Sequence, residues 1–127
     1  MRIAIVGSRN ISVIDDIEKY ISENDEIVSG GAKGVDLCAA EYARKKGIKL
    51  TEFLPQYERY GKYAPIKRNK EIVDYADKII AFWDGQSKGT LSVIKYAEKA
   101  GKECEIVFAN DTEGPSDAGP YKIVEKC

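Results

Sequence analysis

One segment of the chain decides the fold: residues 26–47, which read EIVSGGAKGVDLCAAEYARKKG. The segment opens with a short apolar run that is typical of a buried strand. Glycines follow from Gly30 to Gly34, and an alanine-rich stretch then runs to Gly47, a residue type that commonly ends helices. The pattern predicts a strand over Glu26–Ser29, a helix over Val35–Lys46 and a glycine-bearing loop between them.

The same alternation of strand and helix continues on both sides of this segment. Isoleucines recur at helical spacing between residues 11 and 21, whereas residues 55–64 show no clear period and predict a long loop. Tyr121–Val124 is compatible with an added edge strand. We expect the remaining strands at Ile3–Val6, Ile48–Leu54, Lys78–Trp83 and Glu105–Ala109, and further helices over Pro65–Tyr75 and Thr90–Ala100. This order predicts a Rossmann-like three-layer α/β/α fold with a mainly parallel five-stranded sheet.

The length and charge of the chain indicate its domain organisation and the kind of partner it can bind. The 127 residues fit a single domain over residues 1–127, with a core of about residues 1–108 and a carboxyl-terminal extension over 109–127. The composition, 43% hydrophobic and 32% charged, is that of an ordinary globular protein. With 20 basic and 21 acidic side chains the net charge is −1, so tight binding of long duplex DNA is not expected.

Several chemistries are disfavoured by what the sequence lacks. It contains no histidine, and its cysteines, Cys38, Cys104 and Cys127, form no CxxC pair. A zinc site and a histidine-based catalytic triad are therefore not expected. The apolar start of the chain is too short for a signal peptide, and no run approaches the length of a membrane span. We expect a cytoplasmic protein without a metal site.

Three glycine-bearing loops should lie at one edge of the sheet. Ligands of parallel α/β sheets bind beyond the carboxyl ends of the strands, where helix N-termini favour phosphate. The loops are Gly7–Asn10, Ser29–Asp36 and Asp84–Thr90, and each precedes an expected helix. One such loop is explained by a tight turn, but three at the same edge favour a phosphate site. Neither GxGxxG nor GxxxxGK[ST] is present, so a standard NAD site or P-loop is not expected.

These loops and one helix supply the candidate ligand-binding residues. We expect contacts from Gly7, Ser8, Arg9, Ser29, Gly30, Gly31, Ala32, Lys33, Gly34, Asp36, Arg68, Asn69, Trp83, Asp84, Gly85, Ser87, Lys88, Gly89 and Thr90. Arg68 can clamp a phosphate at two points or form a structural ion pair with an aspartate. The residue types leave two roles open for Asp36, either capping or pairing with Arg9, or contact with a ligand hydroxyl.

Aromatic residues near this edge could stack on a base or simply pack. Trp83 closes an expected strand at the site itself, and Tyr57, Tyr60 and Tyr63 lie in the long loop. Packing is the commoner role of such side chains. Trp83 is the best stacking candidate because it lies at the site itself.

Four motifs together resemble the SLOG superfamily, which joins the DprA/Smf DNA-processing proteins and the LOG proteins. They are Gly7-Ser8-Arg9, the tract from Val28 to Asp36, Arg68-Asn69, and Ser87 to Thr90. The tract from Phe82 to Thr90 is most similar to the small YspA/YpsA-related branch, and the resemblance covers roughly residues 1–108. It implies a Rossmann-like sheet, a site for a nucleotide or nucleotide derivative, and a homodimer.

The resemblance also implies two alternative activities. LOG proteins are phosphoribohydrolases whose motif supplies a catalytic glutamate, but Val93 stands at the corresponding position here. DprA-type proteins bind single-stranded DNA. We expect a protein that binds a nucleotide or ADP-ribose-like ligand, in order to sense or process it. The alternatives are a hydrolase acting through Asp36 or Asp84, and a single-stranded nucleic acid binder. No cofactor is assigned.

Overall fold

A single six-stranded sheet organises the chain. The computed structural model describes residues 1–9, 11, 14, 17–32, 34–109 and 121–126. The strands lie in the order β3-β2-β1-β4-β5-β6, and all are parallel except β6, which runs antiparallel to β5. Their bounds are β1 Arg2–Gly7, β2 Glu26–Ser29, β3 Lys49–Glu52, β4 Lys78–Trp83, β5 Glu103–Ala109 and β6 Tyr121–Lys126.

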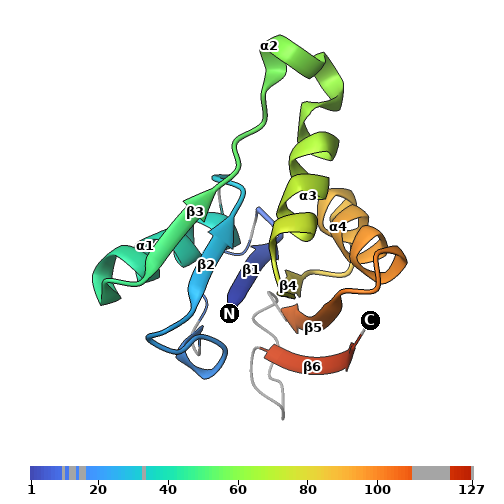
Figure 1. Ribbon diagram of the computed structural model, residues 1–127. Helices are drawn as coiled ribbons and strands as arrows, with labels where there is room; N and C mark the ends of the chain where they lie inside the picture. Colours follow the sequence, from blue (N-terminus) through green and yellow to red (C-terminus); the bar gives the residue numbers. More distant parts are fainter. Residues whose placement is uncertain (10, 12–13, 15–16, 33, 110–120, 127) are drawn as a thin grey trace.

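Helices cover both faces of the sheet (Figure 1). The α-helices are α1 Val35–Lys46, α2 Tyr57–Tyr60, α3 Ala64–Tyr75 and α4 Lys88–Lys99, with short 3₁₀ helices η1 Ile17–Lys19 and η2 Gly61–Tyr63. Side chains of a strand alternate between faces. Ile3 and Ile5 of β1 therefore pack with α1, whereas Ala4 and Val6 pack with α3 and α4. The result is the three-layer Rossmann-like fold that the sequence predicts.

Most of the expected elements are confirmed. Strand β2 and helix α1 have the predicted bounds, and Gly47 ends α1 in the left-handed conformation. Helix α4 begins two residues earlier than predicted, because the Ser87 hydroxyl caps it by accepting the Thr90 N–H at 3.4 Å. The expected edge strand at the carboxyl-terminal end is present as β6.

Two expectations need correction. The segment expected as a long loop contains α2 and η2, and Figure 1 shows it projecting from the sheet as an arm between β3 and α3. Between residues 11 and 21, the described residues form only η1, although all four isoleucines of that stretch are buried in the core. Isoleucine is β-branched and favours a helix weakly, so its burial there does not require helical backbone.

The strand order places a switch point between β1 and β4. Strand β1 pairs with β2 on one side and β4 on the other, so the connections that leave β1 and β4 diverge. Such a divergence opens a crevice at the carboxyl ends of the two strands. In the described part of the chain, no helix is long and apolar enough to cross a membrane.

The turn before α1 requires a glycine for two reasons. Gly34 has φ of +75°, and a Cβ there would lie 2.5 Å from the backbone oxygens of Ser8 and Arg9. Gly34→Ala should lower the free energy of unfolding by about 2–4 kcal/mol, from backbone strain plus a clash. Gly47→Ala is the matched control, since φ there is +69° and nothing lies within 4 Å of the added Cβ. It should cost only about 1 kcal/mol. Urea denaturation measures both, and equal losses would contradict the packing argument.

Candidate functional site

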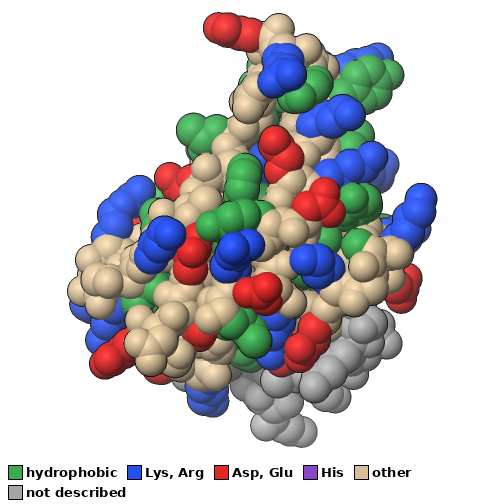
Figure 2. All heavy atoms as spheres, viewed as in Figure 1, with side chains coloured by type: hydrophobic (Ala, Val, Ile, Leu, Met, Phe, Trp, Pro, Cys, Tyr) green, Lys and Arg blue, Asp and Glu red, His purple; other side chains and the backbone are tan. Residues whose placement is uncertain are grey.

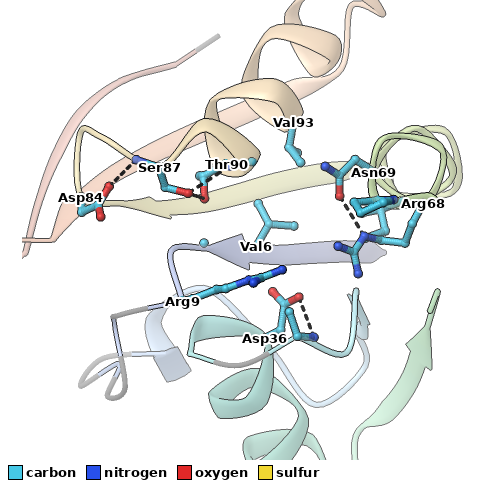
Figure 3. A pocket seen from close by; sticks show the side chains of 14 residues that line it. Val6, Arg9, Asp36, Arg68, Asn69, Asp84, Ser87, Thr90 and Val93 are labelled. Carbon is cyan, nitrogen blue, oxygen red and sulfur yellow. Dashed lines mark hydrogen bonds between the residues drawn. The ribbon is translucent and has the colours of Figure 1, made fainter. Parts of the chain in front are cut away.

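A cavity of about 380 Å³ lies at the switch point (Figure 3). Elements from both halves of the sheet form its walls. It is lined by Val6, Gly7, Arg9, Ala32, Asp36, Pro65, Arg68, Asn69, Ile72, Asp84, Ser87, Gly89, Thr90 and Val93. This volume is within the range of small-molecule sites.

The loop between β2 and α1 forms one wall and is held by its own hydrogen bonds. The Gly31 N–H donates to the Ser29 hydroxyl at 3.4 Å, and the Ala32 N–H donates to Asp36 Oδ2 at 3.2 Å. Ser29 in turn donates to the Asp36 carbonyl. Two backbone donors that a bound phosphate could use are therefore already occupied within the loop.

Arg68 of α3 fastens this loop from the other side of the cavity. Its Nη1 donates to the Gly30 carbonyl at 2.5 Å, and its Nε donates to Asn69 Oδ1 at 2.9 Å. The side chain is only 8% exposed, and burial lowers the pKa of the guanidinium while the Asp36 charge opposes that shift. Arg68 thus has a structural role in the loop, and it also lines the cavity with the rest of its guanidinium.

Asp36 is the most perturbed acid of the site. It lies in the first turn of α1 and is 6% exposed. Burial raises the pKa of Asp36 to about 6, although the Ala32 N–H and the Arg68 charge both oppose this rise. Figure 3 shows Arg9 pointing toward the Asp36 carboxylate. The expected capping role is met in a different form, because Asp36 bonds back to the loop and the N-cap position of α1 is Gly34.

The opposite wall is the start of α4. Asp84 Oδ1 accepts the N–H groups of Gln86 and Ser87, both at 2.8 Å, and so closes the third glycine-bearing loop. The hydroxyls of Ser87 and Thr90 lie 3.3 Å apart beside the cavity (Figure 3). This wall offers hydroxyl groups next to a helix N-terminus, where negative charge is stabilised.

The floor of the cavity is apolar. Val6 of β1, Ile72 of α3 and Val93 of α4 are buried and line it, and Pro65 adds a further apolar surface. No carboxylate stands at Val93, so a LOG-like glutamate mechanism has no acid at this position.

The structure brings ten of the nineteen expected site residues to the cavity. Eight others are described but do not line it, and Lys33 lies outside the described residues. The eight are Ser8, Ser29, Gly30, Gly31, Gly34, Trp83, Gly85 and Lys88.

Several of these eight support the walls instead. The Ser8 hydroxyl accepts the Asp84 N–H at 3.2 Å, which joins the first and third loops. Trp83 packs against Phe108 with ring centroids 5.4 Å apart, and its indole N–H donates to the Ser87 carbonyl at 3.0 Å. Trp83 therefore positions the start of α4, and the structure does not place it where a base could stack in the cavity.

Four cavity residues, Val6, Pro65, Ile72 and Val93, are absent from the ligand-binding residues expected from the sequence. Each belongs to an expected strand or helix, where apolar side chains are explained by core packing. A usable signal existed for Val6, since it directly precedes the first glycine-bearing loop at the end of a strand.

Comparison with known proteins is consistent with this architecture. Residues 1–60 match the YspA, cpYpsA-related SLOG family. The Gene 61 protein of Mycobacterium phage D29 is 40% identical over an alignment of 81 residues that covers 59% of this chain and 65% of the phage protein. The crystal structure of DNA processing protein A (DprA) from Streptococcus pneumoniae is similar with a TM-score of 0.67 and 21% identity, over 91% of this chain.

The matched regions leave part of each relative uncovered. The chain spans 65% of the phage protein and 53% of the DprA chain. At 21% identity the likeness to DprA concerns the fold. The family match over residues 1–60 agrees with the motifs around the cavity, and this part of the chain is similar to the SLOG family.

Proposed function

We propose that the protein binds a nucleotide or a nucleotide-derived phosphate ligand in the cavity at the switch point. The cavity itself carries this proposal, because it combines two guanidinium groups, two hydroxyls at a helix N-terminus and an apolar floor. The similarity of residues 1–60 to the SLOG family supports a role related to nucleotides or nucleic acids. A sensing or binding role fits this site best, and we place that role in the cytoplasm as part of the proposal.

The chemistry of the walls suggests how such a ligand would lie. Arg9 and the outward part of Arg68 would hold phosphate oxygens by charge-assisted hydrogen bonds. Ser87 and Thr90 would bind further oxygens near the positive end of α4. The apolar floor would receive a sugar or base face, and an ADP-ribose-like compound has all of these groups.

Asp36 favours a hydrolase as the second candidate function. A buried carboxylate whose pKa is raised to about 6 can act as an acid or base near neutral pH. Asp84 is less suited, because its Oδ1 already accepts two loop N–H groups. Formation of a free base or a sugar phosphate from a panel of nucleotides would favour this alternative over binding alone.

The projecting arm favours the third candidate, a single-stranded nucleic acid binder. Tyr57 and Tyr63 are exposed there, and Figure 2 shows basic side chains beside hydrophobic ones on this part of the surface. Lys62 lies over the Tyr63 ring at 5.5 Å. Bases can stack on such tyrosines. Binding through the nucleic acid backbone would weaken steeply with salt, which distinguishes it from binding of a mononucleotide.

Arg9 provides the cleanest test of the cavity, since its side chain is exposed at the rim. Arg9→Ala should weaken binding of AMP or ADP-ribose about ten- to hundredfold, the value of one charge-assisted hydrogen bond. The melting temperature of the ligand-free protein should stay unchanged. Titration calorimetry and thermal melts measure the two quantities. Arg59→Ala on the arm is the matched control and should bind both compounds like the wild type. Unchanged affinity in Arg9→Ala would contradict the proposal.

Arg68 should behave differently from Arg9. Arg68→Ala removes the donor to the buried Gly30 carbonyl and leaves Asp36 less compensated. We expect the ligand-free protein to lose about 2–4 kcal/mol of unfolding free energy, and ligand affinity to fall with it. Arg68→Lys should recover part of the stability, because the charge returns but the two-point geometry does not. A ligand-free Arg68→Ala protein as stable as the wild type would show that Arg68 serves the ligand alone.

A homodimer is part of the same proposal. The exposed apolar side chains of the described residues include Leu54, Tyr57, Tyr63 and Ile66, all on or beside the arm. Burying them against a second copy would remove apolar surface from water. Light scattering at micromolar concentration should give twice the mass of 14.1 kDa. A monomer mass would contradict this part of the proposal and leave the cavity argument unaffected.

A further inference from the structure

The place where an external anion would bind is already taken by a side chain of this chain. The first turn of a helix stabilises negative charge, and Asp36 lies in the first turn of α1 at the wall of the cavity. Its Oδ2 accepts the Ala32 N–H, a donor that a phosphate oxygen could otherwise use.

Charged groups face Asp36 from several elements. Arg68 on α3 and Arg9 after β1 share the cavity with it, and Asp84 lies on the opposite wall. The negative charge of Glu52 of β3 raises the pKa of Asp36, and Tyr57 raises the pKa of Arg68. Two cations and two further carboxylates thus surround one buried acid.

Gly30 allows this acid and its main cation to approach each other. A Cβ at Gly30 would lie 2.6 Å from Arg68 Nη1 and 3.0 Å from Asp36 Oδ2. Both groups therefore lie against the bare α-carbon of one residue. A ligand phosphate that reaches Arg68 from the cavity must come close to the Asp36 carboxylate.

We propose that the Asp36 carboxylate is the resident anion of the cavity, and that an anionic ligand binds together with one proton, which Asp36 takes up from solvent. No covalent bond forms or breaks. The inference rests on the proposed function, since it concerns the same cavity.

The physical reason is repulsion between like charges at short range. A second negative charge beside a buried carboxylate disfavours the ionised form, so the bound state should hold a proton that the free state loses. Burial already raises the pKa of Asp36 in the free protein to about 6. Below that pH the proton is present in both states, and affinity should not depend on pH. Above it, affinity should fall with rising pH, by about fiftyfold between pH 6 and 8 if the bound state stays protonated.

The test uses ADP-ribose and inorganic sulfate, because neither changes its own charge between pH 5 and 8. Titration calorimetry in buffers of different ionisation enthalpy counts the protons taken up. For the wild type at pH 7.5 we expect uptake close to one proton. Asp36→Asn keeps an oxygen acceptor for Ala32 but removes the charge, so it should bind without proton uptake and equally well at pH 6 and 8. Asp74→Asn, on α3 and outside the cavity lining, should behave like the wild type.

Thermal melts without ligand give a second measurement. The raised pKa means that folded protein binds the Asp36 proton more tightly than unfolded protein, so stability from this group is lost as pH rises through about 6. The wild-type melting temperature should fall relative to Asp36→Asn between pH 5 and 7. Binding that is independent of pH in the wild type would overturn the inference alone. Failure of both probes to bind at any pH from 5 to 8 would overturn the proposed function with it.

Discussion

The hydrogen bond from Arg68 to the Gly30 carbonyl is the interaction on which the site depends. Gly30 follows β2, whereas Arg68 belongs to α3 on the opposite face of the sheet from α1. The bond therefore connects the loop between β2 and α1 to helix α3. Asn69 fixes the guanidinium through Nε, and the missing side chain at Gly30 leaves room for it. This bond adds a link to α3 to the hydrogen bonds that the second loop makes within itself.

These hydrogen bonds change what the glycine-bearing loops can do. The loops are usually thought of as sources of free backbone donors for phosphate. Here the N–H groups of Gly31 and Ala32 are used inside the second loop, and those of Gln86 and Ser87 inside the third. In the proposed binding mode, recognition would therefore depend on side chains that project from the loops. Arg9, whose side chain is exposed, would supply most of the specificity.

The sequence was sufficient for the sheet because the evidence for it is local. Each strand is a short apolar run, and Pro65 and Gly47 mark helix boundaries by their own backbone preferences. The cavity was harder, since its floor joins Val6, Ile72 and Val93 from three separate elements. Apolar residues of this kind look alike whether they face a core or a ligand. The packing role of Trp83 could not be predicted from the sequence either, because its partner Phe108 lies on the neighbouring strand β5.

The apolar floor has two opposite effects on the charged side chains above it, because it strengthens attraction between opposite charges and disfavours each buried charge. Val6, Ile72 and Val93 give the base of the cavity an apolar surface, and electrostatic interactions are stronger in apolar surroundings than in water. Such surroundings would strengthen the attraction between the guanidiniums and the proposed phosphate. They also penalise Asp36, whose pKa rises because burial outweighs both the Arg68 charge and the loop N–H groups. Burial lowers the pKa of Arg68, which means that the charged guanidinium is disfavoured there. Without the Asp36 carboxylate, this buried charge would lose a nearby compensating charge. Asp36 therefore balances the Arg68 charge, and in the proposed bound state a phosphate would take over that balance once the carboxylate is protonated.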